Sequence, residues 1–140
     1  MGIELIPLAT IDITFREAIS VGVGPAGDRL VGELATFDMT GDRLTARLRG
    51  VAAADWAVVS PNAVLSPDVR VTVETGDGAI IYITYQGRVD MTDGWAASVP
   101  YVAGRFETAD PRYSWLNTVL AVGKGQVVEN GLRYEWYEVR

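Results

Sequence analysis

The sequence predicts an all-β protein, built as one closed antiparallel β-barrel of about 8–10 strands with one short helical turn near residues 111–117. Apolar and polar residues alternate with a period of two, as in Val69, Val71 and Val73, which is typical of strands with one face against a core. Turn sequences such as Asn130-Gly131 recur between these runs. Closing the sheet removes the unpaired edges that so many strands would otherwise expose.

The expected strands follow one another in meander order. Two of them, over 3–8 and 11–16, precede a glycine-rich segment at 22–27. Its glycines match a dinucleotide-binding pattern, but no βαβ unit surrounds them, so we interpret the segment as a hairpin loop. The remaining strands are expected at 29–38, 43–51, 55–60, 68–75, 79–89, 100–108, 118–122 and 132–139.

Two connections between strands have distinctive sequences. In the helical turn, Asp110 takes the N-cap position and Pro111 the first helical position. The turn would form a plug or corner between two strands. The segment 89–100 is the longest without a strand pattern, and two interpretations stay open: a lid across the barrel mouth, with Met91 and Trp95 as its apolar face, or a plain hairpin loop.

Length and composition indicate a single domain over residues 1–140, with 49% hydrophobic residues to form a core. The chain has no His and no Cys. These absences exclude disulfides, zinc fingers, a thiol nucleophile and a Ser-His-Asp triad. We therefore expect chemistry from Asp, Glu, Tyr and Arg. A metal held by the protein would need oxygen ligands, and we expect none.

The charge and hydropathy of the chain limit the classes of partner that it can bind. The net charge of −6 argues against nucleic acid, which binds to basic surfaces. The N-terminus does not resemble a signal peptide, and no apolar run is long enough to span a membrane. We expect a cytoplasmic protein without a membrane partner. We also expect a homodimer, because barrels of this size often pair through outer faces that remain apolar.

Several motifs together resemble a known family. The most specific is Phe106-Glu107-Thr108-Ala109-Asp110-Pro111-Arg112-Tyr113-Ser114-Trp115-Leu116-Asn117. Shorter matches are Asp77-Gly78, Ala54-Asp55-Trp56, the alternating polar residues of 68–75, and Tyr137-Glu138-Val139. The chain resembles the DUF3237 (UPF0311) family of small bacterial proteins. The resemblance implies a closed antiparallel β-barrel, similar in outline to the allene oxide cyclase barrels, with a lumen that folds or isomerises apolar molecules without a cofactor.

Four polar residues are the candidates for catalysis. Asp55 precedes Trp56, and a carboxyl beside an indole in a barrel wall would have a raised pKa, as a general base requires; alternatively, Asp55 only caps a turn. Glu107 is an acid–base candidate if its face of the strand points into the lumen. Arg70 and Tyr82 would stabilise an oxyanion if they face inward. The alternative for Arg70 is the wet outer face of the sheet.

Aromatic residues are the candidates for substrate binding, because Trp and Tyr combine an apolar ring with a hydrogen-bond donor. Packing in the core is the alternative interpretation for each of them. Arg88, near a strand end, is a weaker candidate of the same kind as Arg70. The substrate-binding candidates are Trp56, Tyr85, Arg88, Trp95, Tyr101, Trp115 and Trp136.

Three functions fit these residues. The first is a cofactor-independent isomerase, lyase or cyclase that acts on a small apolar or unsaturated, polyketide-like or aromatic molecule in the lumen. The second is a non-catalytic carrier of a small apolar ligand. The third is a structural or interaction protein whose lumen is filled by its own side chains. A cavity that contains a buried acid would favour the enzyme, whereas an aromatic cavity without one would favour the carrier.

Overall fold

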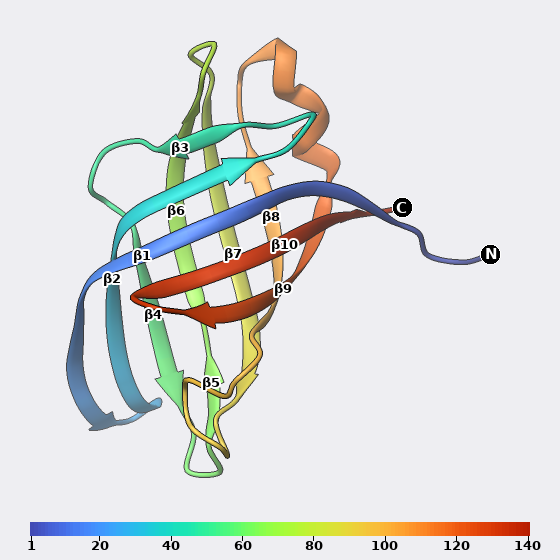
Figure 1. Cartoon of the computed structure of the whole chain (residues 1–140). Helices are drawn as coiled ribbons and strands as arrows, with labels where there is room; N and C mark the ends of the chain where they lie inside the picture. The colour runs from blue at the N-terminus through green and yellow to red at the C-terminus, as the bar shows by residue number, and fades with distance from the viewer.

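The computed structural model describes residues 1–140 as a barrel of ten strands and one 3-10 helix (Figure 1). The helix η1 (Pro111–Thr118) lies at one end, beside the turn between β6 and β7. The strands are β1 (Leu5–Gly24), β2 (Gly27–Thr40), β3 (Ala46–Leu48), β4 (Ala54–Val59), β5 (Val64–Ser66), β6 (Asp68–Thr75), β7 (Ile80–Asp90), β8 (Tyr101–Glu107), β9 (Leu120–Val128) and β10 (Gly131–Val139).

The sheet closes because β1 pairs on one side with β10 and on the other with β2. All pairs are antiparallel. The short strands β3 and β4 follow one another along β2, and β5 and β6 follow one another along β7. Ten strands therefore occupy eight places around the barrel, and the predicted closed antiparallel fold is confirmed.

Four of the expected strands differ from the structure. The strand expected over 118–122 is longer, because β9 continues to Val128. The stretches 3–8 and 11–16 are parts of the single strand β1, because a bulge between Pro7 and Ala9 absorbs the irregularity without ending the pairing. The strand expected over 43–51 pairs only at β3. The short strand β5 was not expected at all, and Pro67 separates it from β6.

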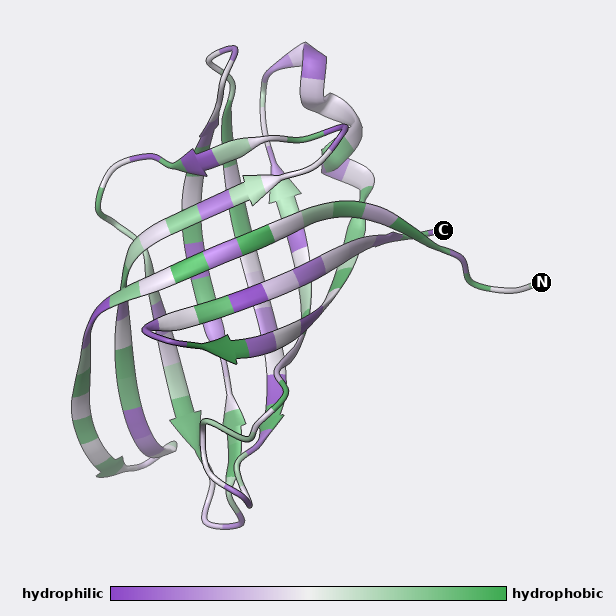
Figure 2. Ribbon diagram, in the orientation of Figure 1, coloured by the Kyte–Doolittle hydropathy of each residue, from purple (hydrophilic) through white to green (hydrophobic).

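Apolar side chains fill the half of the barrel nearer η1. On β6, Val69, Val71 and Val73 point inward and are buried, and Ile81 and Ile83 meet them from β7. Figure 2 shows the resulting alternation of hydrophobic and hydrophilic residues along the strands. These side chains belong to a core of 24 buried residues that receives Leu116 from η1.

The predicted helical turn is present as η1. Asp110 caps it by accepting a hydrogen bond from the Arg112 backbone N–H, and Pro111 opens it, as expected. No helix in the chain is both long and apolar enough to cross a membrane.

Glycines on β8 and β9 provide space for the largest core side chain. Trp136 of β10 is 1% exposed and lies opposite Gly123. A Cβ at Gly123 would lie 2.5 Å from Trp136 Cδ1, and one at Gly104 would lie 2.6 Å from Cη2. The indole therefore needs glycine at both positions, an arrangement in which a cross-strand aromatic ring covers the bare backbone.

We predict that Gly104→Ala destabilises the protein by about 1–3 kcal/mol, because the added methyl overpacks the core against the Trp136 ring. Gly76→Ala is the matched control, since nothing lies within 4 Å of a Cβ at that position. Urea unfolding measures both variants. Equal midpoints for the two would contradict the packing described here.

Candidate functional site

The end of the barrel opposite η1 is open on one side. β1 pairs with β10 only as far as Thr14, which lies opposite Gly131. Beyond Thr14, β1 continues to Gly24 paired with β2 alone, and the resulting hairpin projects from the barrel (Figure 1). The β1–β2 hairpin therefore extends beyond its pairing with β10.

A cavity of about 290 Å³ occupies this open end. Residues of the projecting hairpin, of strands β4, β5, β7 and β10, and of the 91–100 loop surround it. Most of the lining side chains are apolar, and Asp55 is the one charged residue among them. The lining consists of Phe15, Ala18, Leu30, Gly32, Asp55, Ala57, Leu65, Pro67, Val89, Met91, Trp95, Pro100, Leu132 and Tyr134.

Asp55 is held in the cavity wall by the strand geometry around it. It lies opposite Gly32 of β2 and Val69 of β6. Its Oδ1 accepts a hydrogen bond of 2.9 Å from the backbone N–H of Asp68. Burial raises the pKa of Asp55 from 3.8 to about 6; the hydrogen bond opposes this shift and the nearby Asp68 carboxylate adds to it. Both protonation states are therefore populated near neutral pH.

Tyr134 is the second polar group of the cavity. Burial and the nearby Asp55 charge raise the pKa of its hydroxyl, so it stays protonated and remains a hydrogen-bond donor. Its ring packs on Gly125, where a Cβ would lie 2.7 Å from Cε1. This packing fixes the ring, so the donor has a defined position.

Tyr85 and Trp136 lie behind Tyr134. The Tyr85 ring centroid is 6.1 Å from that of Tyr134 and 5.2 Å from that of Trp136, in edge-to-face contacts. Burial raises the pKa of the Tyr85 hydroxyl well above its ordinary value. The two side chains separate the cavity from the filled half of the barrel, so both predicted residues lie inside but do not line the cavity.

The 91–100 loop flanks the cavity. Met91, Trp95 and Pro100 contribute to the lining, and Trp95 remains 36% exposed. The loop is tied back on itself where Ser98 donates through its hydroxyl to the Trp95 carbonyl at 2.7 Å. Of the two interpretations of this segment, the structure supports a loop that covers one side of the barrel mouth.

Three of the four catalytic candidates face outward, so their expected place in the lumen is wrong. Arg70 alternates with inward valines on β6 and is exposed; Tyr82 alternates with Ile81 and Ile83 on β7. Glu107 follows inward Phe106 on β8 and is exposed. Successive side chains of a strand point to opposite faces, so these three cannot join Asp55 in one site.

Other predicted binding residues also lie elsewhere. Trp56 faces outward, where the Arg70 guanidinium stacks 4.4 Å from its ring centroid. Arg88 is exposed and donates to the neighbouring Gly87 carbonyl, and Tyr101 is 54% exposed on the outer face. Trp115 lines an open hollow of about 600 Å³ with Arg43, at the end that holds η1.

Tyr134 and Leu132 line the cavity but were not among the candidates. The signal was present, because both share the alternation of β10 with Trp136. Phe15 could not be found in the same way, since register shifts on either side of it interrupt the alternation of β1. No three carboxylates in the chain converge as metal ligands would.

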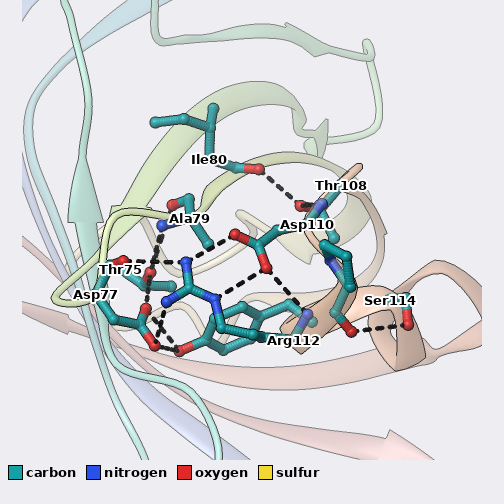
Figure 3. Close-up of polar contacts among 10 residues, drawn as sticks. Thr75, Asp77, Ala79, Ile80, Thr108, Asp110, Arg112 and Ser114 are labelled. Carbon is teal, nitrogen blue, oxygen red and sulfur yellow. Dashed lines mark hydrogen bonds and ion pairs between the residues drawn. The ribbon is translucent and has the colours of Figure 1, made fainter.

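The most specific sequence motif lies at the opposite end from the cavity. Arg112 donates through Nε and Nη2 to the Asp110 carboxylate at 3.0 and 2.8 Å, and through Nη2 to the Asp77 carbonyl at 3.0 Å (Figure 3). The Tyr113 hydroxyl donates to the Asp77 carboxylate. This clasp of Asp77, Asp110, Arg112 and Tyr113 ties η1 to the turn between β6 and β7.

Comparisons with known proteins place the chain in a family. The model described as "Protein of unknown function (DUF3237)" matches residues 3–139. A UPF0311 protein of Rhodopseudomonas palustris is 27% identical over 124 residues, covering 80% of this chain and 77% of that protein. A crystal structure of a β-barrel-like protein from Acinetobacter baumannii superposes with a TM-score of 0.90 at 26% identity, covering 100% of this chain and 98% of the other.

A fungal protein matches part of the chain. The hydroalkoxylation enzyme phnH of Penicillium herquei is 38% identical over 56 residues, which covers 40% of this chain and 31% of that protein.

We predict that Asp55→Asn reduces the pH dependence of stability. Because the folded pKa is raised, Asp55 stabilises the fold below about pH 4, and this contribution is lost as the pH rises through about 6. The free energy of unfolding of the variant relative to wild type should therefore be higher at pH 8 than at pH 3.5 by about 1–3 kcal/mol. Glu107→Gln, on the outer face, is the control; an equal pH response of both variants would refute the assignment.

Arg112→Met should lower the melting temperature by removing the clasp. The hydrogen bonds from Arg112 lower the pKa of Asp110 to about 2, so the stabilisation is present above about pH 4 and is lost as the pH falls through 2. The difference in melting temperature between the variant and wild type should have its full size at pH 5 and should be smaller at pH 2. Arg88→Met is the control, and a loss no larger than that of the control would rule out the clasp.

Proposed function

Since the chain belongs to the DUF3237 family, we propose that it is a cofactor-independent isomerase or cyclase. Its substrate is a small, neutral, unsaturated molecule bound in the cavity at the open end of the barrel. Asp55 acts as both the acid and the base. The observation that carries this proposal is a single carboxyl with a pKa of about 6 in a cavity lined mainly by apolar side chains.

The cavity selects for size and charge. Its volume of about 290 Å³ corresponds to roughly ten water molecules at about 30 Å³ each, which suits a molecule of one or two rings. The lining contains no cation to bind a carboxylate or phosphate, and the ionised Asp55 would repel an anion. A neutral phenol, enol or alcohol with an apolar body fits this environment.

A single carboxyl is sufficient for a redox-neutral addition of O–H across a carbon–carbon double bond in the same molecule. Protonated Asp55 gives its proton to one alkene carbon. The substrate oxygen bonds to the other carbon, and the resulting carboxylate takes the hydroxyl proton. The product is a cyclic ether isomeric with the substrate, and Asp55 returns to its starting state. Tyr134 would donate a hydrogen bond that positions the substrate oxygen.

The partial likeness to phnH supports this class of reaction, since that protein is a hydroalkoxylation enzyme. Isomerisation by proton transfer between two carbons would need the same carboxyl. The second candidate function, a carrier of a small apolar ligand, is favoured by the mainly apolar lining of the cavity. The two functions differ in whether the bound molecule is changed.

The experiment is an assay on phenols that carry a 2-allyl or 2-prenyl group, with conversion to the cyclic ether followed by chromatography and binding followed by calorimetry. We expect turnover by wild type, and a rate about 10²–10⁴-fold lower for Asp55→Asn, the range that general acid–base groups contribute. Glu107→Gln should retain the wild-type rate. Binding without conversion, unchanged in Asp55→Asn, would instead identify a carrier.

A further inference from the structure

We propose that the outer face of β1, β2 and β4 binds a second copy of the chain, forming a symmetric homodimer. We call this surface the hairpin face; its apolar residues are Ile19, Val21, Val31, Trp56 and Val58. The inference does not depend on the proposed reaction, because the hairpin face lies on the outside of the wall that carries Asp55.

The hairpin face is continuous across three strands. Val31 lies opposite Ile19 on β1 and opposite Trp56 on β4. Val58 occupies the next outward position of β4, opposite Arg29. Ile19 is 42% and Val21 68% exposed, and Figure 2 shows that hydrophobic residues continue along β1 into the projecting hairpin. Contiguous exposed apolar side chains of this kind mark interaction sites.

The charges beside the apolar residues are grouped by sign. Glu17 of β1 lies directly opposite Glu33 of β2, an arrangement of like charges that destabilises a sheet. Two arginines flank Trp56: Arg29 donates to the Trp56 carbonyl at 2.8 Å, and Arg70 stacks on the indole. None of the four forms an ion pair within the chain.

This pattern is complementary to itself. Glu17, Glu33, Ala54 and Arg70 lie in one row across the sheet. A two-fold axis that lies in the interface and runs along the strands between Val31 and Trp56 therefore places Glu17 of each copy opposite Arg70 of the other. Dimers with such an axis use the same patch on both subunits. Tryptophan and arginine are the residue types that contribute most to binding at protein interfaces, and here both lie at the centre of the face.

The composition of the hairpin face also favours a second copy over other partners. The two carboxylates and the two guanidinium groups named above balance one another. Nucleic acid would require an excess of basic groups. An acidic or a basic protein would leave one of the two charged pairs facing like charges, whereas a second copy places Glu17 of each chain opposite Arg70 of the other.

The test uses two variants with reversed charges, Glu17→Lys/Glu33→Lys and Arg29→Glu/Arg70→Glu. Sedimentation velocity should give wild type twice the chain mass of 15.2 kDa. In a dimer of either variant alone, like charges would face each other across the interface, which should raise the dissociation constant of the dimer roughly tenfold or more. An equimolar mixture of the two should restore the dimer, because each acidic patch then meets a basic one.

The mixture separates a lost interface from a damaged fold, since misfolded chains would not complement one another. Arg105→Glu/Glu107→Arg, on the outer face of β8, is the matched control and should remain dimeric. Monomeric wild type at 100 µM would overturn the proposal, as would reversed variants that dimerise like wild type or a mixture that stays monomeric.

Discussion

The aromatic side chains of β10 divide the interior of the barrel into two halves, and the rest of the molecule depends on this division. Trp136 packs against Gly104 and Gly123, and Tyr134 packs against Gly125. On one side of these rings, branched aliphatic side chains and η1 fill the lumen. On the other side β1 departs from β10 after Thr14, and a cavity remains. A barrel of this size can be filled or can hold one small ligand; here one half is filled and the other contains a cavity.

The position of Asp55 gives the open half its chemistry. The carboxyl shares the cavity wall with apolar residues, which raises its pKa to about 6, while the other acidic groups with shifted pKa values, Asp77, Asp90, Asp110 and Glu138, have lowered ones. The polar clasp around Arg112 and the candidate site thus lie at opposite ends of the barrel. The pKa values of the clasp carboxyls, Asp77 and Asp110, are lowered, whereas that of Asp55 is raised. The clasp joins η1 to the turn between β6 and β7, which indicates a structural role, whereas the cavity is the site of the proposed reaction.

Much of the fold could be predicted from residue patterns because it follows from local chemistry. The strict alternation of 68–75 and the Asp110-Pro111 start of η1 both have direct local causes. The full length of β1 could not be predicted, because bulges interrupt its alternation.

For the site, alternation shows which residues share a face but not which face is inside. Arg70, Tyr82 and Glu107 are site candidates only if the polar face is the inner one, whereas the apolar residues between them fill the lumen. Asp55 differs because Ala57, two residues along on the same face, leaves the space that the cavity occupies.

The central claim is that the cavity holds a carboxyl that exchanges its proton near neutral pH. The most direct measurement is a ¹³C NMR titration of the Asp55 carboxyl carbon, assigned by its disappearance in Asp55→Asn. A midpoint near pH 6 is the expected result. A midpoint at or below 4, the ordinary value for aspartate, would show that the carboxyl is solvated and ionised, and it would contradict the proposed acid–base role.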